Sequence, residues 1–187
     1  MGATREETRD DLLEAAYDVV VAGNWARARM ADVAAAAGVS RQTLYNEFGT
    51  KDALAQALAL REAHRFLAAT ESAIACAGDP VQAVATAVAT TLRAAADNPL
   101  LKAVLTDDAG DLLPYLTTRA EPILAAARAG IQRDLLAHWP ALDPDEVDLV
   151  AEALVRLTVS YLVLPGDLPA QVVAARTARL VERLLGG

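Results

Sequence analysis

A short segment near the N-terminus, residues 41–48, carries polar side chains at a spacing that could place them together on one face of a helix. If residues 41–48 form a helix, Leu44 and Phe48 lie four residues apart and point inward together. The outward side chains then end in hydrogen-bonding groups, and they are Arg41, Gln42, Thr43, Tyr45 and Asn46. Groups of this kind can contact phosphates and exchange hydrogen bonds with the edges of bases.

The residues before this segment predict a tight turn from another short helix. Residues 32–37 are rich in alanine, which lets two helices cross closely, and Gly38 can take the left-handed conformation that ends a helix. Ser40 is a favourable N-cap for the segment that follows. Two short helices joined in this way form a helix-turn-helix.

The residues after this segment extend the same surface. Thr50 is expected to cap a further helix that begins at Lys51. The ammonium of Lys51 would then lie beside the unpaired backbone NH groups of the first turn, and together these donors favour a phosphate.

The parts needed for catalysis are missing from the sequence. The chain has two histidines, His64 and His138, and one cysteine, Cys76. It has no nucleophile elbow, phosphate loop or paired metal-ligand spacing. We therefore expect no enzyme activity, no cofactor and no metal. Cys76 is expected to be a small buried hydrophobic residue, with a redox sensor as the alternative.

Length and composition indicate an intracellular globular protein. The chain has 187 residues, of which 54% are hydrophobic and 22% charged, enough for one or two small domains. No apolar run approaches the roughly 18 residues of a membrane span, so we expect a cytoplasmic protein. The formal net charge of −8 argues against indiscriminate binding to nucleic acid. Site-specific binding then requires positive charge that is concentrated locally.

The spacing of apolar residues predicts an all-α fold of about nine helices, with no alternating strand pattern. A first amphipathic helix is expected over 5–22, and a long connector helix over 51–77. We expect a DNA-binding domain over 1–50 and a helical effector-binding and dimerisation domain over 51–187.

Two apolar helices near the C-terminus favour self-association. Dimer contacts are expected from Leu154, Tyr161, Val173, Leu180 and Leu184. The alternative is that both helices only close the core of the monomer.

An effector pocket is expected among the connector and the helices between about residues 80 and 165. Its candidate lining residues are His64, Tyr115, Trp139, Thr158 and Tyr161. Each of them could instead be an ordinary core residue. Alanine, leucine and valine dominate this region, so the expected ligand is apolar or amphipathic.

Residues 34–54 resemble the DNA-binding signature of TetR-family transcriptional regulators. Gly38-Val39-Ser40, Thr43-Leu44-Tyr45, Phe48 and Lys51 all stand at the spacing of that family, and the resemblance covers about residues 5–58. It implies a three-helix head whose third helix lies in the major groove, and a homodimer that binds a palindromic double-stranded DNA operator.

The resemblance also implies roles for individual residues. Gln42 and Thr43 would face base edges, whereas Tyr45, Asn46, Thr50 and Lys51 would mainly hold phosphates. The full set of expected DNA contacts is Arg29, Ser40, Arg41, Gln42, Thr43, Tyr45, Asn46, Thr50 and Lys51.

The sequence departs from the family pattern in three ways: at Arg29, at the turn Gly23-Asn24-Trp25, which is one residue longer than usual, and at Gln42 and Glu47. Arg29 stands where the second helix usually begins with Thr or Ser, and it makes most sense as a phosphate contact. Glu47 stands where a basic or aromatic residue is common. Residues 1–52 hold six basic and nine acidic residues, so we expect weak non-specific binding and a steep loss of affinity with salt.

The mechanism predicted from these features is that of a ligand-released repressor. Two recognition helices would lie about 34 to 36 Å apart, and an effector near the connector would spoil that spacing. The alternative is a helical module of the same fold that binds a small molecule or a protein without binding an operator.

Overall fold

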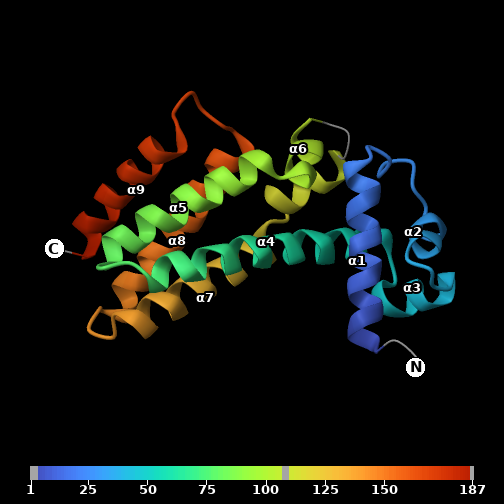
Figure 1. Cartoon of the computed structure of the whole chain (residues 1–187), viewed down its shortest axis with the longest axis horizontal. Coiled ribbons are helices and arrows are strands. Elements are labelled where there is room, and N and C mark those ends of the chain that lie inside the picture. The colour runs from blue at the N-terminus through green and yellow to red at the C-terminus, as the bar shows by residue number, and fades with distance from the viewer. Residues whose placement is uncertain (1–3, 107–109, 186–187) are drawn as a thin grey trace. The chain divides into compact units, whose positions relative to one another are not determined.

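The computed structural model describes residues 4–106 and 110–185, and within these ranges the fold is all helical, as predicted (Figure 1). Nine α-helices and one 3-10 helix, η1, make up this described part. In chain order they are α1 (Arg5–Val21), α2 (Met30–Ala36), α3 (Arg41–Phe48), α4 (Lys51–Ala75), α5 (Pro80–Asp97), α6 (Pro99–Leu105), η1 (Gly110–Leu116), α7 (Glu121–His138), α8 (Pro144–Val163) and α9 (Ala170–Leu185).

Local capping explains where several helices begin. At the start of α1 the Glu7 backbone NH donates to Thr4 Oγ1 over 3.2 Å, and the Thr4 NH donates to Glu7 Oε2 over 2.6 Å. Before α6 and α8, Asn98 and Asp143 accept hydrogen bonds from first-turn NH groups. Each is followed by a proline, a residue that fits the first position of a helix.

The chain divides into two compact units. Unit 1 comprises Met1–Arg61 and Asn98–Arg119, and unit 2 comprises Glu62–Asp97 and Ala120–Gly187. Helix α4 contributes residues to both units. Unit 1 extends beyond the domain expected over residues 1–50, because α6 and η1 pack with the N-terminal helices.

The core of unit 1 lies among α1–α4, α6 and η1. Trp25, Leu12, Leu44, Leu54 and Leu58 are its largest fully buried side chains. Leu100, Val104, Leu112 and Tyr115 complete the same cluster. Burying α6 and η1 against the head gives those short helices a stability that they would lack alone.

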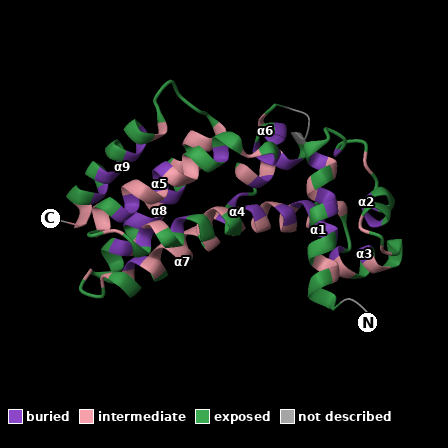
Figure 2. Ribbon diagram, viewed as in Figure 1, coloured by how far each residue is buried: buried purple, intermediate pink, exposed green. Residues whose placement is uncertain are grey.

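Helices α5 and α9 pack along much of their length in unit 2, and α7 packs along α8. Buried residues follow the inward faces of these helices, whereas their outer faces are exposed (Figure 2). The core includes Val84, Val88, Leu135, Val147 and Val150. Among the described residues, no helix is both long and apolar enough to cross a membrane.

Candidate nucleic-acid interface

Helix α3 is held in place by two buried anchors and by a cap at its first turn. Leu44 is fully buried and Phe48 nearly so, as predicted from their spacing. Ser40 Oγ accepts from the Thr43 NH over 3.0 Å, which confirms the predicted N-cap. Gly38 has a φ of +68°, the left-handed conformation predicted for the turn before α3. The outward face is therefore presented on a fixed helix.

The outward side chains of α3 pair with one another along the helix. Gln42 Nε2 donates to Asn46 Oδ1 over 2.7 Å. The guanidinium of Arg41 lies 5.2 Å from the ring centre of Tyr45. These pairs are four residues apart and restrict the rotamers of exposed side chains. Gln42 still offers its carbonyl oxygen and Asn46 its amide NH groups, so the pair can act as one donor-and-acceptor unit toward a base.

Glu47 ties the start of α1 to α3. Its carboxylate accepts from Arg9 Nη1 at 2.8 Å and from Arg5 Nε at 3.0 Å. The Arg9 guanidinium also lies 4.7 Å from the Phe48 ring centre. The hydrogen bond from Arg9, followed by that from Arg5, holds the pKa of Glu47 below its ordinary value. The sequence showed only an unusual acid here, although Arg5 and Arg9 do share one face of a helix.

Arg29 is the N-cap residue of α2, but its side chain does not cap the helix, because a guanidinium cannot accept a hydrogen bond from the helix NH groups. The Arg29 backbone NH instead donates to Asp32 Oδ2 over 2.8 Å, so the acid three residues later stabilises the helix start. The Arg29 side chain is exposed and remains available to a phosphate. In the preceding turn, Gly23 has a φ of +69°.

The ammonium of Lys51 is used inside the protein, which differs from the predicted phosphate site. Lys51 Nζ donates to the carbonyl oxygens of Trp25 at 2.6 Å and Ala28 at 2.9 Å. It also lies 4.8 Å from the Trp25 ring centre. Thr50 Oγ1 accepts from the Ala53 NH over 3.0 Å, so the predicted cap of α4 is confirmed. Sequence spacing located the helix start but could not show which acceptors surround Lys51.

Asp52 makes a second set of contacts from the same turn of α4. The Tyr115 hydroxyl donates to Asp52 Oδ1 at 2.6 Å and to the Asp52 carbonyl oxygen at 3.0 Å. Arg119 Nη1 donates to the same Oδ1 over 2.7 Å. The hydrogen bond from Tyr115, and then that from Arg119, lower the pKa of Asp52. Burial, reinforced by Asp52, raises the pKa of Tyr115.

The residues predicted to line an effector pocket belong to different units and differ in burial. Tyr115 is a buried core residue of unit 1. His64 is exposed, whereas Thr158 is half-buried. Trp139 and Tyr161 pack against the core of unit 2. Cys76 is exposed, so the expectation of a buried thiol was wrong, because α4 ends one residue before it.

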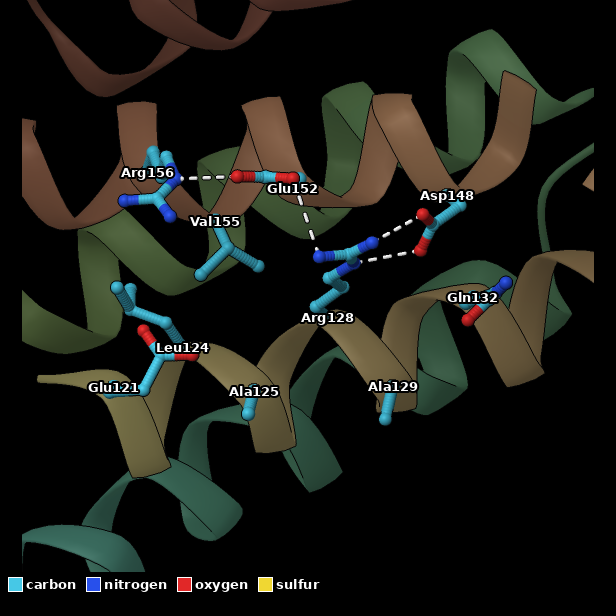
Figure 3. A pocket seen from close by; sticks show the side chains of 10 residues that line it. All are labelled: Glu121, Leu124, Ala125, Arg128, Ala129, Gln132, Asp148, Glu152, Val155 and Arg156. Carbon is cyan, nitrogen blue, oxygen red and sulfur yellow. Dashed lines mark hydrogen bonds and ion pairs between the residues drawn. The ribbon is translucent and has the colours of Figure 1, made fainter. Parts of the chain in front are cut away.

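A groove of about 340 Å³ lies between α7 and α8 in unit 2 (Figure 3). Its lining residues are Glu121, Leu124, Ala125, Arg128, Ala129, Gln132, Asp148, Glu152, Val155 and Arg156. Arg128 forms a two-pronged ion pair with Asp148 and also reaches Glu152 at 3.3 Å. Arg156 Nε donates to Glu152 over 2.9 Å. The groove thus combines apolar groups with a charged network that the sequence pattern did not reveal.

The predicted dimer contacts fall into two classes. Leu154 and Val173 lie in the core of unit 2 and have little surface to offer a partner. Leu180 is exposed, and Tyr161 and Leu184 are half-buried. The helical period placed all five on apolar helices, but it could not distinguish the inner side of a helix from the outer one.

Comparison with known proteins matches both parts of the chain to one family. Residues 12–58 match the model for bacterial regulatory proteins of the tetR family, and residues 79–183 match the C-terminal domain of the bacterial tetracyclin repressor. The HTH-type transcriptional regulator AlkX of Mycobacterium tuberculosis is 35% identical over 181 residues, which cover 96% of this chain and 85% of that protein.

Solved structures share the fold over nearly the whole chain. The TetR family repressor AlkX from Dietzia sp. strain DQ12-45-1b, implicated in biodegradation of n-alkanes, is 30% identical with a TM-score of 0.81, and 97% of each chain is covered. RolR in complex with resorcinol is 19% identical with a TM-score of 0.71, covering 97% of this chain and 94% of that one, which shows the fold alone. The helix-turn-helix geometry and these matches together establish that the chain belongs to the TetR family of DNA-binding transcriptional regulators.

Proposed function

We propose that the protein is a ligand-released repressor that binds a palindromic operator as a homodimer. The observation that carries this proposal is the outward face of α3, whose polar side chains are fixed by the buried Leu44 and the Ser40 cap. The chain is 30% identical to a solved TetR family repressor, and this similarity supports repression as the outcome of DNA binding.

In this proposal α3 enters the major groove with Gln42 and Thr43 toward base edges. The Gln42–Asn46 pair presents an acceptor and donors side by side, the pattern that an adenine edge requires. Arg29, Arg41, Tyr45 and Thr50 are exposed on the same head, and we assign them to the DNA backbone.

The dimer is proposed to form through the outer faces of α8 and α9. Large apolar side chains are exposed there, and they are Leu149, Leu157, Val172 and Leu180. Leu149 keeps 57% of its surface exposed in the single chain, and large apolar side chains grouped on exposed helix faces mark sites of protein–protein contact. We assign the dimer contact to these four exposed residues in place of the buried Leu154 and Val173.

The effector is proposed to be an apolar or amphipathic molecule that binds unit 2. The groove between α7 and α8 falls in the size range of small-molecule sites, and Leu124, Ala125 and Val155 supply apolar contact. The solved AlkX repressor is implicated in biodegradation of n-alkanes, which suggests effectors with an alkyl chain. Because coupling is reciprocal, operator DNA must weaken effector binding by the factor with which the effector weakens operator binding.

The test is fluorescence-anisotropy binding to DNA fragments that flank the protein's own gene, at low and at higher salt. We expect tight, salt-sensitive binding that is weakened in Gln42→Ala and Tyr45→Ala while both variants stay folded. An n-alkane and the matching primary alcohol are then added to the bound complex. A folded dimer that binds no fragment at low salt would favour the alternative module without operator binding. Equal effector affinity with and without operator would exclude release of the repressor from DNA by the effector.

A further inference from the structure

The first turn of α4 contacts two segments that lie far from each other in the sequence. Lys51 binds the carbonyl oxygens of Trp25 and Ala28, in the turn between α1 and α2. The next residue, Asp52, accepts hydrogen bonds from Tyr115 in η1 and from Arg119. All of these residues belong to unit 1. Two adjacent side chains therefore connect the α1–α2 turn with η1.

The α1–α2 turn carries two exposed cations. Arg27 precedes Ala28, and Arg29 follows it, so a hydrogen bond to the Ala28 carbonyl fixes the backbone between them. The turn also has backbone hydrogen bonds of its own, among them those from the Arg27 and Ala28 NH groups to the Asn24 carbonyl at 3.2 and 2.9 Å. The Trp25 side chain is buried beneath the ammonium. Lys51 thus adds two side-chain hydrogen bonds to the backbone hydrogen bonds that hold the turn carrying Arg27 and Arg29.

Asp52 links the same helical turn to a segment that continues into unit 2. Tyr115 is almost fully buried, so its hydroxyl has a fixed position from which to bind Asp52. Arg119 is followed after one residue by Glu121, the first residue of α7 and part of the α7–α8 groove. The chain itself therefore leads from the groove to the contact with Asp52.

We propose that Lys51 and Asp52 are positioning residues for DNA binding. Lys51 fixes the α1–α2 turn so that Arg27 and Arg29 meet the DNA backbone, and Asp52 makes that arrangement depend on the docking of η1. This inference rests on the proposed operator binding. It gives Lys51 an indirect role in place of the direct phosphate contact that its position in the sequence suggests.

The two roles of Lys51 differ in how its loss combines with the loss of Arg29. Lys51→Met keeps the aliphatic stem and removes the ammonium, and Lys102→Met removes the other lysine of unit 1 as a matched control. A direct phosphate contact reduces the slope of log affinity against log salt by about 0.9 and adds independently to Arg29→Met. Indirect positioning reduces the slope by up to roughly 1.8, and Arg29→Met then costs little further affinity.

A second measurement examines the free protein. In a Trp139→Phe background Trp25 is the remaining tryptophan, and acrylamide quenching reports its accessibility. We expect Lys51→Met, and not Lys102→Met, to raise the quenching of Trp25 without DNA present. Unchanged quenching, or losses of affinity that add independently, would overturn the role given to Lys51. Absence of DNA binding by the wild type would instead refute the proposed function, and quenching would still decide whether Lys51 holds the turn.

The role of Asp52 is tested through its buried partner. Tyr115→Phe removes the hydroxyl that binds Asp52 and keeps the packed ring, whereas Thr117→Ala removes a nearby hydroxyl that donates to the Leu113 carbonyl. We expect Tyr115→Phe to lower operator affinity by about threefold to tenfold and to combine non-additively with Lys51→Met. Operator affinity equal to that of Thr117→Ala would overturn the link between η1 and the head.

Discussion

Removal of the Glu47 charge is expected to weaken the fold of unit 1 and to strengthen non-specific DNA binding. Glu47 holds Arg9 at 2.8 Å and Arg5 at 3.0 Å, and both arginines lie on the first turns of α1. In Glu47→Gln the side chain keeps its size and a neutral acceptor oxygen. The arginines lose their ion pair and become available to phosphates.

The cost in stability follows from the exposure of the partners. The side chain of Glu47 is 12% exposed, but that of Arg9 is 42% and that of Arg5 is 83% exposed, so solvent screens much of the attraction. Ion pairs of this kind contribute about 0.2 to 1 kcal/mol. Because Arg9 also stacks on Phe48, we expect a loss near the upper end, about 1 kcal/mol in the free energy of unfolding at neutral pH.

The effect on stability should depend on pH in one direction. The arginines lower the pKa of Glu47 from its ordinary value of 4.5, so the folded state favours the charged carboxylate. This stabilisation is complete above the unfolded pKa and is lost as the pH falls through the lower, folded pKa. The difference between the wild type and Glu47→Gln should therefore shrink in acid.

The assay combines urea unfolding, followed by circular dichroism, with binding to a random-sequence duplex. Unfolding is compared at about pH 7, where the carboxylate is charged, and at a series of decreasing pH values through which it becomes protonated. In binding, up to two freed arginines would steepen the salt slope by roughly 0.9 to 1.8. Glu6→Gln, which removes an exposed acid of α1, the helix that carries Arg5 and Arg9, is the control for net charge. The reasoning is refuted if the stability difference persists in acid, or if both variants bind the duplex equally.

Three other outcomes follow from the structure. Leu44→Ala removes a fully buried side chain of the recognition helix and should cost about 2 to 5 kcal/mol in the free energy of unfolding, measured by urea denaturation. Gln42→Ala should lower operator affinity by about 1 to 3 kcal/mol in anisotropy titrations while the salt slope stays constant, and a changed slope would point to a phosphate contact. Leu149→Asp should shift the protein from dimer to monomer in sedimentation velocity without unfolding it, whereas Asp148→Asn, on the groove side of α8, should remain dimeric.

Short-range interactions were enough to predict the helices and the segment that contacts DNA. Gly38, Ser40, Leu44 and Phe48 act through interactions within a few residues, so their spacing was enough to predict the turn, the cap and the buried face. The start of α4 after Thr50 followed from the same local chemistry. The family resemblance rests on these same short-range features, which explains why it could be recognised before the structure.

Tertiary structure decided what each polar side chain contacts. Lys51 and Trp25, Asp52 and Tyr115, and Glu47 and Arg5 lie 26, 63 and 42 residues apart in sequence, beyond the reach of any helical period. The period identified apolar faces, but it could not show that Leu154 faces the core while Leu149 faces outward. Local hydrogen bonds and periodicity determine helices, whereas long-range packing determines which charges are paired, and so which cations remain for DNA.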